Sequence, residues 1–376
     1  MLIKTIHIDG VRNLQVVGFN CHPEINVFLG SNGSGKTSLL ESMCFLAMGR
    51  SFRTSKSNNI INFNRQFASV AATYSDQTLT QDLKIMTMKH RSQDKVSKIG
   101  GTVASVSEVA ALTPTQIIND ETSRLVFKDP EGRRKFLDWL VFYSNNNYHQ
   151  LWRDFNKVLQ QRNRLLKMRV SKLTSMLDQI DVMFAGLSGR LAAARRAVWQ
   201  NFQPVWQEMS RQLNIGWSAA LDIRLFDGWT GDLLQQLQSS RATDLKFGST
   251  CCGSHKADLR VLINNSPAKE ILSRGQGKVL SMAMILARAK FITTIADRSD
   301  FVSVLLVDDL CAELDDINVK QVVKALCDLT ANVQVFITGA DRNKLLAVLP
   351  KDRSCWFGVS NGQIESIMLE NSVESL

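Results

Sequence analysis

The spacing of hydrophobic and polar residues differs among three parts of the chain. Residues 1–30 and 67–88 alternate between apolar and polar side chains, which predicts β-strands, antiparallel in the second stretch. Between Asn146 and Ile215 apolar residues recur every three or four positions in two successive stripes, which predicts two long helices folded back on each other. From Gly277 onward, apolar strands and helices alternate. The pattern therefore predicts an α/β fold that carries a mostly α-helical inserted lobe.

Shorter stretches complete the predicted elements. A buried strand at Ile25–Leu29 is followed by a helix over Ser38–Met48, which closes at Gly49. Further elements are expected as strands at 221–225, 302–307 and 333–338 and as helices at 233–245, 277–295 and 319–329. Changes in the apolar and polar pattern along the chain predict one lobe from residues 1–120 and 301–376. They also predict a helical lobe or arm at 121–250 and the end of that lobe at 251–300.

A glycine-rich segment lies between the first buried strand and its helix: Gly30-Ser31-Asn32-Gly33-Ser34-Gly35-Lys36-Thr37, followed by Ser38. Glycines let consecutive backbone N–H groups turn toward one anion, and the helix dipole adds positive potential there. Lys36 is expected to reach the β- and γ-phosphates of a nucleotide, and the Thr37 hydroxyl to bind Mg²⁺. A glycine turn that matches by chance is the alternative. The strand and helix on either side favour a nucleoside triphosphate site lined by all of these residues.

A second carboxylate motif follows a predicted buried strand. Residues 302–307 are apolar and end in Asp308-Asp309. A strand that delivers an aspartate to a phosphate loop is the usual second half of such a site, with Asp308 placed for Mg²⁺. Asp309 would then orient or deprotonate the attacking water. A strand that merely meets a polar turn has the same pattern, but the phosphate loop favours a hydrolytic site.

The segment Ser273-Arg274-Gly275-Gln276 precedes the predicted helix at 277–295. A serine and a glycine at a helix N-terminus make another anion site, although a plain capped helix is the alternative. One triphosphate does not need two helix N-termini from distant parts of a single chain. We therefore expect a second copy to supply this segment in an ATP-dependent homodimer, which is the arrangement of ABC-type ATPases.

The charge of the chain favours an anionic partner. It has 45 basic against 35 acidic residues, a formal net charge of +10 and a sequence pI near 9.3. Nucleic acid is the commonest such partner, and a basic surface that only aids solubility is the alternative. Many cations fall in the predicted helical stretch: Arg153, Lys157, Arg162, Arg164, Lys167, Arg169, Lys172, Arg190, Arg195 and Arg196. They form either the solvated face of amphipathic helices or a DNA-contacting arm.

Other sequence features narrow the setting. No run of 18 apolar residues is present, so no membrane span is expected. The seven cysteines lack C-x-x-C spacing, and the adjacent Cys251 and Cys252 suit neither zinc nor a relaxed disulfide. Reduced thiols and an N-terminus without a signal-peptide layout predict a cytoplasmic protein. The five histidines lack ligand spacing, so no metal beyond nucleotide-bound magnesium is expected.

These motifs, in this order and wording, resemble the RecF family of bacterial recombination mediators, which is related to the SMC heads. The likeness runs over nearly the whole chain and rests on Arg12-Asn13, Gly49–Arg53, Pro114–Gln116, Asp129–Trp139 and Asp308–Asp315. It implies a P-loop ABC-type, SMC-like ATPase head with a helical insertion, which binds ATP and Mg²⁺.

The resemblance also implies roles for single residues. Arg12 would approach the nucleotide, Gln116 would sense Mg²⁺ and the γ-phosphate as a catalytic residue, and Asp315 would reach across the dimer. The segment Gly253–Leu259 departs from the family's wording, which puts its role in doubt. Gly277 stands where bulkier residues are common and is expected to loosen the helix start.

The resemblance implies a protein of recombinational repair and replication restart. It would dimerise on ATP at gapped DNA or at junctions of single- and double-stranded DNA, with RecR and RecO as partners in loading the recombinase. Contacts with DNA are expected mainly at backbone phosphates.

Hydrolysis is expected to be slow and stimulated by DNA. Asp309 is one methylene shorter than the glutamate of transporter-type heads, and the strand that ends at Thr338-Gly339 carries no histidine. Two alternatives remain: a DNA clamp that binds ATP without functionally required hydrolysis, and the ATPase subunit of a membrane transporter. The missing histidine argues against the second.

Overall fold

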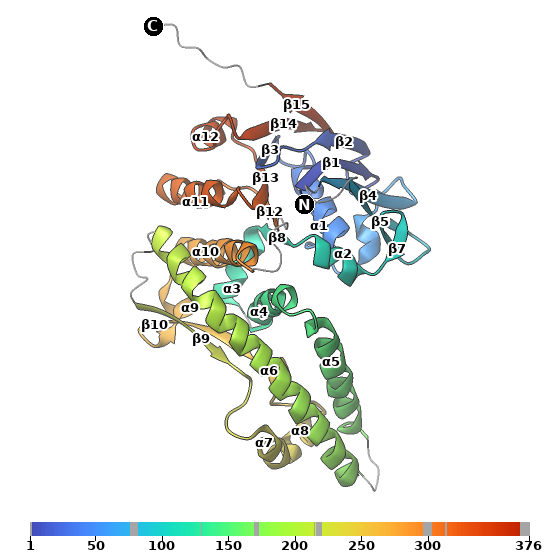
Figure 1. Cartoon of the computed structure of the whole chain (residues 1–376), viewed down its shortest axis with the longest axis vertical. Helices are drawn as coiled ribbons and strands as arrows, with labels where there is room; N and C mark the ends of the chain where they lie inside the picture. The colour runs from blue at the N-terminus through green and yellow to red at the C-terminus, as the bar shows by residue number, and fades with distance from the viewer. Residues whose placement is uncertain are drawn as a thin grey trace. The chain divides into compact units, whose positions relative to one another are not determined.

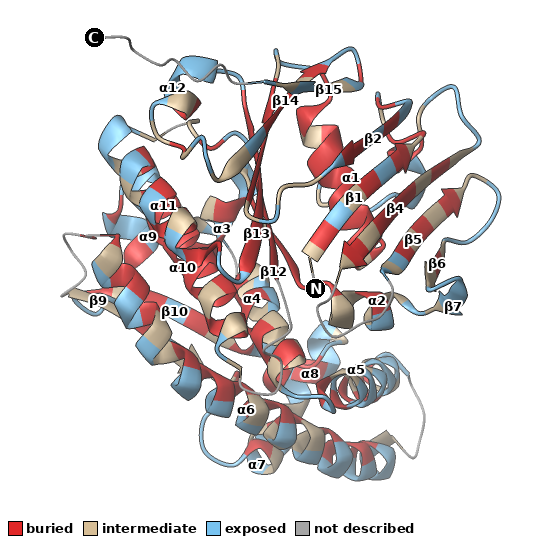
Figure 2. Cartoon of the chain, turned by 45° about the horizontal axis from the view of Figure 1, so that its top comes forward, coloured by how far each residue is buried: buried red, intermediate tan, exposed pale blue. Residues whose placement is uncertain are grey.

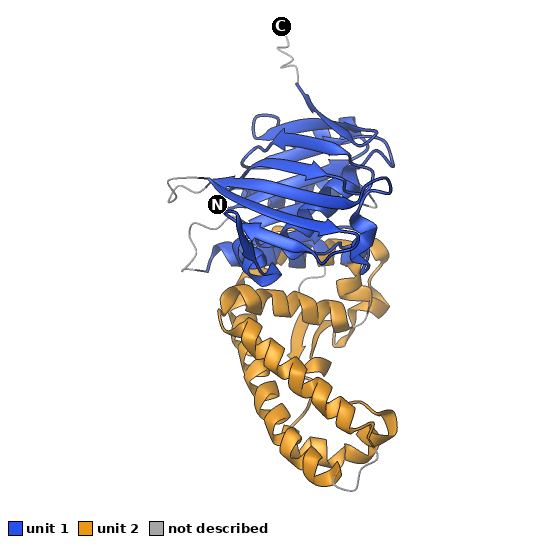
Figure 3. Ribbon diagram, turned by 90° about the vertical axis from the view of Figure 1, so that its right-hand side faces the viewer, with its two compact units in different colours: residues 1–122, 282–376 blue, residues 123–281 orange. Residues whose placement is uncertain are grey.

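The computed structural model describes residues 2–75, 82–128, 130–168, 173–213, 215, 220–295, 303–312 and 314–368. The chain folds into two compact units, which Figure 3 distinguishes by colour. Unit 1 consists of residues 1–122 and 282–376, and unit 2 of residues 123–281. The chain thus returns to unit 1 at Met282, inside a helix, and not at residue 301 as the sequence pattern predicted. In the second half of that helix, Arg288 donates a hydrogen bond to Gln116 of unit 1.

Unit 1 begins with an antiparallel sheet (Figure 1). Its strands lie in the order β2-β1-β4-β5-β6-β7. They are β1 (Leu2–Asp9), β2 (Val16–Asn20), β4 (Phe67–Ser75), β5 (Leu83–His90), β6 (Val96–Ile99) and β7 (Thr102–Ala104). The short helix α2 (Val106–Leu112) follows β7 and starts with a capping box between Ser105 and Glu108. The alternating pattern at 67–88 correctly predicted the antiparallel pair β4–β5.

The second sheet of unit 1 is largely parallel and has the order β15-β14-β3-β13-β12-β8. Its strands are β3 (Ile25–Leu29), β8 (Thr115–Ile118), β12 (Ser303–Val307), β13 (Val333–Gly339), β14 (Ser354–Ser360) and the antiparallel edge strand β15 (Gln363–Ile367). The predicted start of β12 at Val302 lies outside the described residues. Every residue of β3, β12 and β13 is buried, as expected for the central strands of a parallel sheet. Figure 2 shows this burial for β12 and β13.

Helix α1 (Lys36–Met48) packs against strands of both sheets of unit 1. Eleven of its residues are buried, and its apolar side chains join a hydrophobic core cluster that includes Leu39, Leu40 and Phe45. The helix ends at Gly49 in the left-handed conformation, as the sequence predicted. Unit 1 also contains α11 (Asp316–Leu329) and α12 (Arg342–Leu346), and α10 (Arg274–Thr293) enters it from unit 2.

The parallel order of the strands places the phosphate loop beside the predicted carboxylate motif Asp308-Asp309. Strands β3, β13, β12 and β8 are neighbours and run in the same direction. Their carboxyl ends therefore share one edge of the sheet, which is where ligands bind in open α/β sheets. The residues after Leu29, Val307 and Ile118, together with the last residues of β13, meet there.

Unit 2 is mostly helical, as predicted. Its helices are α3 (Arg124–Phe127), α4 (Pro130–Ser144), α5 (Tyr148–Leu165), α6 (Leu173–Gln212), α7 (Leu233–Ser239), α8 (Arg241–Phe247) and α9 (Ala268–Ile271). A small antiparallel sheet has the order β11-β10-β9, with β9 (Leu221–Phe226), β10 (Asp258–Ile263) and β11 (Ser266–Pro267). The predicted pair of long helices corresponds to α5 and α6, which pack along each other.

The single helix predicted at 233–245 is wrong, because the structure divides it into α7 and α8 at Ser240. The side chain of Asp232 caps α7, and Asp244 of α8 is buried in an ion pair with Arg162. The break therefore lets α8 present a carboxylate to the interior of unit 2. In the described part of the chain, no helix is both long and apolar enough to cross a membrane.

Candidate functional site

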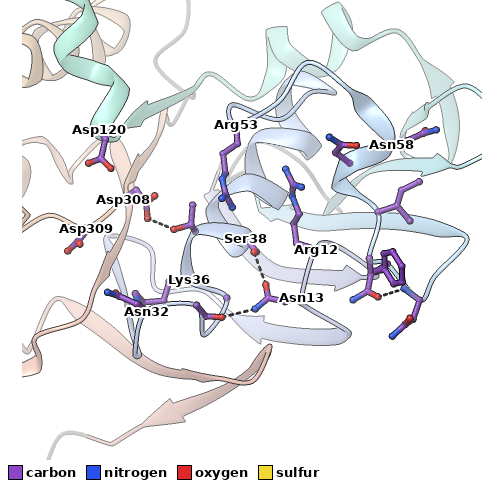
Figure 4. A pocket seen from close by; sticks show the side chains of 18 of the residues that line it. Arg12, Asn13, Asn32, Lys36, Ser38, Arg53, Asn58, Asp120, Asp308 and Asp309 are labelled. Carbon is purple, nitrogen blue, oxygen red and sulfur yellow. Dashed lines mark hydrogen bonds between the residues drawn. The ribbon is translucent and has the colours of Figure 1, made fainter.

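A cavity of about 1010 Å³ opens at the carboxyl edge of the parallel sheet in unit 1. The phosphate loop contributes Asn32, Gly33, Gly35, Lys36 and Thr37, and Ser38 follows them in α1. Figure 4 shows Lys36 and Asn32 at one end of this cavity, near Asp308 and Asp309, with Arg53, Arg12 and Asn58 further along. The structure therefore brings together residues from distant parts of the sequence, as the two motifs required.

The glycines of the loop are required by its path. Gly33 and Gly35 have positive φ angles of 81° and 122°, which side chains with a Cβ rarely adopt. A Cβ on Gly30 would lie 2.3 Å from the carbonyl oxygen of Val359. Helix α1 starts at Lys36 without a side-chain cap among the described residues, so its first N–H groups are left for a ligand.

Ser34 adds a further polar group to the loop. Its hydroxyl is buried and has no hydrogen-bond partner among the described residues. Such orphaned groups are rare in folded proteins, and a bound ion or ligand is one of the usual reasons for them. Ser31 takes part through its carbonyl oxygen, which accepts a hydrogen bond from the Lys36 ammonium.

Lys36 lies across its own loop. Its ammonium group donates to the carbonyl oxygens of Gly30 at 2.6 Å and Ser31 at 2.9 Å, and only 9% of the residue is exposed. Burial lowers the pKa of Lys36, while the charges of Asp309 and Asp308 oppose that shift. A buried cation held beside the loop suits the binding of phosphate anions.

Asp308 is held by two threonine hydroxyls. Thr338 Oγ1 donates to its Oδ1 at 2.8 Å and Thr37 Oγ1 at 3.1 Å. Burial raises the pKa of Asp308; the two hydrogen bonds oppose the shift, and the nearby Asp120 and Asp309 add to it. Thr37 and Asp308, the predicted Mg²⁺ ligands, thus lie in direct contact.

The donor set fits magnesium bound together with phosphates. Hydroxyl and carboxylate oxygens are ligands that Mg²⁺ prefers, and the ion usually takes only one or two groups from the protein. Among the described residues, no group of three or more His, Cys, Asp or Glu side chains could hold a metal by itself. The site thus offers two oxygen ligands, Thr37 and Asp308, and leaves the remaining positions to phosphates and water.

Asp309 is exposed and lines the cavity next to Asp308. Its φ angle of 50° is left-handed, and its N–H donates to Thr338 Oγ1 at 2.9 Å. Thr338, which the sequence analysis did not single out, therefore fixes both aspartates at once. A polar residue near the carboxyl end of β13, the neighbour of β12, was the signal that could have revealed it.

Gln116 lies away from the cavity, and its predicted role in sensing Mg²⁺ and the γ-phosphate stays a prediction. Its side chain is buried, does not line the cavity and accepts a hydrogen bond from Arg288 Nε at 2.6 Å. The reason lies in the register of the strands: the Asp308 N–H donates to the carbonyl of Ile118, so Gln116 lies two residues before the sheet edge at which the cavity opens. Asp120, just beyond the end of β8, lines the cavity instead.

Arg12 and Asn13 lie in the turn between β1 and β2 and line the same cavity. Asn13 Nδ2 donates to the Gly33 carbonyl at 3.1 Å, while Asn13 Oδ1 accepts from the Ser38 hydroxyl at 2.7 Å. Asn13 therefore fixes the phosphate loop from outside. The Arg12 guanidinium forms two hydrogen bonds with the buried Glu41 of α1.

The far end of the cavity was missed by the sequence analysis. It is lined by Asn58, Asn59, Ile61, Asn62, Phe63, Asn64 and Arg91. Arg91 donates to the carbonyl oxygens of Arg65 and Asn62, at 2.9 Å and 3.0 Å, which holds this segment against the turn after β5. Clustered asparagines between Asn58 and Asn64 were the available signal, but loop composition alone does not indicate a ligand.

In unit 2, the segment Ser273–Gln276 is exposed. The Ser273 hydroxyl accepts from the Gln276 N–H at 3.3 Å, and the Gln276 side chain accepts from the Ser273 N–H at 2.9 Å. This reciprocal pair forms a capping box at the start of α10. Arg274 and Gly275 occupy the first turn.

Gly277 has a packing role. A Cβ at this position would lie 2.1 Å from the Phe127 ring, so only glycine fits under α3. The Ser281 hydroxyl also donates to the Gly277 carbonyl at 2.7 Å. The expectation that Gly277 loosens the helix start stays a prediction, while the structure shows that this glycine permits close packing there.

Asp315 is the N-cap of α11, and its side chain accepts from the Asn318 N–H at 2.8 Å. The residue is exposed in unit 1. Its reach across a dimer therefore stays a prediction beside this capping role. Glu313, which belongs to the same motif, lies outside the described residues.

The arginines of the motif Asp129–Trp139 form contacts within unit 2. Arg133 donates to both oxygens of Asp258, at 2.7 Å and 3.1 Å, and to the carbonyls of Leu125 and Lys128. Arg134 donates to the Ala257 carbonyl at 2.9 Å. The altered segment Gly253–Leu259 thus supplies the partners of both arginines. Asp129 itself lies outside the described residues.

The basic residues singled out in the predicted helical stretch are not all exposed to solvent. Arg162 is fully buried and pairs with Asp181 at 2.6 Å and Asp244 at 2.7 Å. Arg195 is also buried and pairs with Asp138 at 2.7 Å. The exposed members are Arg153, Lys157, Arg164, Lys167, Arg190 and Arg196. Arg169 and Lys172 lie outside the described residues.

The excess of positive charge is confined to one unit. Unit 2 carries 24 Lys and Arg against 13 Asp and Glu, whereas unit 1 carries 21 against 22. The cavity with the phosphate loop therefore belongs to a nearly neutral unit.

Comparisons with known proteins agree with these motifs. A family model described as the RecF/RecN/SMC N-terminal domain matches residues 2–354. The DNA replication and repair protein RecF of Shewanella amazonensis is 32% identical over 378 residues, which cover 97% of this chain and 99% of the relative. The RecF protein of Cellvibrio japonicus is 33% identical over 354 residues, which cover 92% and 93%.

Two solved structures are similar in architecture. The recombination mediator protein RecF-ATP of the RecFOR pathway matches with a TM-score of 0.83 at 25% identity and covers 98% of both chains. An Smc head bound to the C-winged helix domain of ScpA matches with a TM-score of 0.59 at 16% identity, covering 99% of this chain and 98% of that one. They confirm the predicted fold, an ABC-type, SMC-like head with a helical insertion.

Proposed function

Because the chain belongs to the RecF family, within the wider RecF/RecN/SMC group, we propose that it is an ATP-dependent DNA-binding protein of recombinational repair and replication restart. The observation that carries this proposal is the cavity in which Lys36, Thr37, Asp308 and Asp309 converge. A relative of the same architecture was solved as RecF-ATP, which supports ATP as the nucleotide.

The phosphate loop and Lys36 bind the triphosphate. N–H groups at the start of α1 and in the glycine-rich turn donate to phosphate oxygens, and the helix dipole adds favourable potential. Lys36, now bonded to the carbonyls of Gly30 and Ser31, supplies a cation to the same phosphates. Thr37 and Asp308 hold Mg²⁺, whose charge offsets that of the phosphates.

Asp309 positions the attacking water in this proposal. It is exposed to the cavity, and its backbone is fixed by Thr338. A carboxylate is a suitable acceptor for a proton from water, but the short aspartate side chain limits its reach. We therefore propose slow hydrolysis that times the opening of an ATP-bound complex.

A second copy completes the reaction centre in this proposal. Ser273 and its neighbours belong to unit 2 and are exposed, while the phosphate loop belongs to unit 1. An exposed helix N-terminus with serine and glycine suits the γ-phosphate of ATP bound to another molecule. In this proposal Asp315, at the start of α11 in unit 1, contacts the same partner, and its exposure supports that role.

DNA binds chiefly to unit 2 in this proposal. Its excess of basic residues, many of them exposed on α5 and α6, suits contacts with backbone phosphates of gapped DNA or single-/double-strand junctions. The relatives' name, DNA replication and repair protein RecF, supports DNA as the partner. RecR and RecO follow as protein partners in loading the recombinase, and the work takes place in the cytoplasm.

The rate of ATP turnover with and without gapped DNA, across a salt series, tests this proposal. We expect turnover well below the roughly 10 s⁻¹ of a typical enzyme, stimulation by gapped DNA, and loss of that stimulation as salt weakens DNA binding. Lys36→Ala serves as the control that should abolish turnover under all conditions. Fast turnover that ignores DNA, or turnover that survives in Lys36→Ala, would contradict the proposal.

A further inference from the structure

Glu41 is a buried carboxylate directly behind the wall of the nucleotide cavity. It lies in α1, is completely inaccessible to solvent and does not line the cavity. Arg12 Nε donates to its Oε2 at 2.9 Å, and Arg12 Nη2 donates to its Oε1 at 2.6 Å. The Ser51 hydroxyl donates to Oε1 at 2.5 Å, and Arg53 Nη1 lies 3.9 Å from Oε2. Two separate segments, the β1–β2 turn and residues 51–53, thus converge on one carboxylate.

Two of these partners face the place where phosphates are expected. Arg12 and Arg53 both line the cavity, and their side chains are 24% and 52% exposed. Figure 4 shows them between the end that holds Lys36 and Asp308 and the end that holds Asn58. Two guanidinium groups against one carboxylate leave a positive charge at this wall, which suits an anionic ligand.

The geometry of Arg12 is over-determined. Its backbone has a φ of 54°, an uncommon conformation for an arginine, and its N–H donates to the Ile60 carbonyl at 2.8 Å. A paired, two-bond contact with a buried carboxylate also fixes the direction of the guanidinium group. An arginine held this way loses little conformational freedom when an anion arrives.

We propose that Glu41 is a positioning residue of the nucleotide site, which holds Arg12, and with it Arg53, in place to engage the phosphates of ATP. This inference rests on the proposed binding of ATP in the same cavity. Glu41 acts through the arginines and does not touch the nucleotide. A purely structural role, in which the pair only joins the β1–β2 turn to α1, gives a different result in the following experiment.

A double-mutant cycle on nucleotide affinity tests the inference. The dissociation constant of the non-hydrolysable analogue AMP-PNP, with Mg²⁺, is measured by calorimetry for wild type, Glu41→Gln, Arg12→Gln and the double variant. We expect Glu41→Gln to weaken binding about tenfold in the wild-type background, because a neutral amide no longer holds the guanidinium group. In the Arg12→Gln background the same change should have little further effect.

Two outcomes overturn the inference: an unchanged affinity in Glu41→Gln, or an equal loss from Glu41→Gln with and without Arg12. Thermal unfolding of each variant shows whether it is folded. If Glu41→Gln does not fold, Ser51→Ala replaces it, because it removes one hydrogen bond from the same carboxylate and keeps both arginine side chains. The Ser51 hydroxyl also accepts hydrogen bonds from the N–H groups of Arg53 and Thr54, so this variant loosens the segment that carries Arg53 as well. Ser51→Ala should weaken binding about threefold, and an unchanged affinity contradicts the inference.

Matched controls separate this inference from the proposed function. Arg53→Ala should weaken binding, whereas Arg50→Ala, an exposed arginine of the same segment that does not line the cavity, should not. A loss in Arg50→Ala as large as that in Arg53→Ala contradicts the role given to Arg53. If wild type fails to bind the analogue, or Lys36→Ala binds as tightly as wild type, the proposed function itself fails. If wild type binds, Lys36→Ala does not, and Glu41→Gln behaves as wild type, the proposed function stands and the role of Glu41 fails.

Discussion

The two units use their charged residues in opposite ways. In unit 1 acidic and basic residues nearly balance, and several of them face a cavity: Lys36, Arg12, Arg53, Asp308 and Asp309. In unit 2 basic residues dominate, yet its buried charges, such as Arg162 with Asp181 and Asp244, face the interior. Charge in unit 1 is therefore arranged for a small anionic ligand. Charge in unit 2 forms ion pairs inside the unit, and in the proposed function its exposed basic residues bind DNA.

Because of this difference, fewer arginines of unit 2 are available to bind DNA than the sequence count suggests. Arg133, Arg162 and Arg195 are each held in ion pairs with aspartates inside the unit. A buried cation with fixed partners is not free to neutralise a backbone phosphate. Substitutions in the two units should therefore affect protein stability, the binding and hydrolysis of ATP, and DNA affinity separately.

The largest effect is expected from breaking the buried charges of unit 2. Arg162→Ala leaves Asp181 and Asp244 buried without their main partner, which should lower the free energy of unfolding by about 3–5 kcal/mol. Urea unfolding followed by tryptophan fluorescence measures the change. Arg164→Ala, on the same helix but exposed, should alter stability by about 0.5 kcal/mol or less. If the two substitutions changed stability equally, the proposed stabilising role of the Arg162 ion pairs would be refuted.

A second pair of variants separates the binding of ATP from its hydrolysis in unit 1. Asp309→Asn should reduce turnover about 100-fold while nucleotide still binds, because only the proton acceptor is lost. Lys36→Ala should abolish both. Turnover and analogue affinity are measured side by side. If cells that depend on this protein tolerate Asp309→Asn but not Lys36→Ala, a DNA clamp that needs only ATP binding becomes the better description.

Removing exposed cations from unit 2 should weaken DNA binding without touching the nucleotide. The double change Lys157→Ala with Arg190→Ala is expected to lower affinity for gapped DNA about tenfold and to reduce the slope of log affinity against log salt by roughly 0.9 per charge. The same change at Lys320 and Lys324, exposed on α11 of unit 1, is the matched control. Equal losses for both pairs would mean that the charge difference between the units does not direct DNA.

The smallest effect is an acid sensitivity of unit 2. Burial lowers the pKa of His255 from 6.5 to about 4, because the ring packs beside Phe155 and Phe184. The unfolded chain takes up this proton near pH 6.5 and the folded chain only near pH 4, so stability present above pH 6.5 is lost as the pH falls through that window. Between pH 7 and 5.5 the loss should be about 1 kcal/mol. Urea unfolding at several pH values should show a flatter dependence in His255→Gln, and an unchanged slope would exclude this histidine as the cause.

The parts of the site that are determined by residues close together in sequence were predictable. Strand β3, the loop from Gly30 to Thr37 and helix α1 follow from glycine spacing and apolar runs, and β12 with Asp308 follows from a buried run that ends in a carboxylate. These features need only neighbours in sequence. The structure places their residues along one cavity.

Contacts between distant segments were not predictable in the same way. Gln116 was assigned to the site from a resemblance, but strand register puts Asp120 there. Thr338, Glu41 and Asn13 act through partners that only the folded chain brings near. Helical periodicity put Arg162, four residues after Val158, on the apolar stripe and Arg164 off it, but it could not show which carboxylates pair with Arg162.

The central claim is that each molecule holds an incomplete reaction centre and obtains Ser273 with its neighbours from a second copy. Multi-angle light scattering of the wild-type chain, saturated with AMP-PNP and Mg²⁺, tests it directly. The account predicts a particle of twice the 42.1 kDa chain mass, which returns to the single mass when nucleotide is removed. A particle that stays at 42.1 kDa under saturating analogue would contradict it.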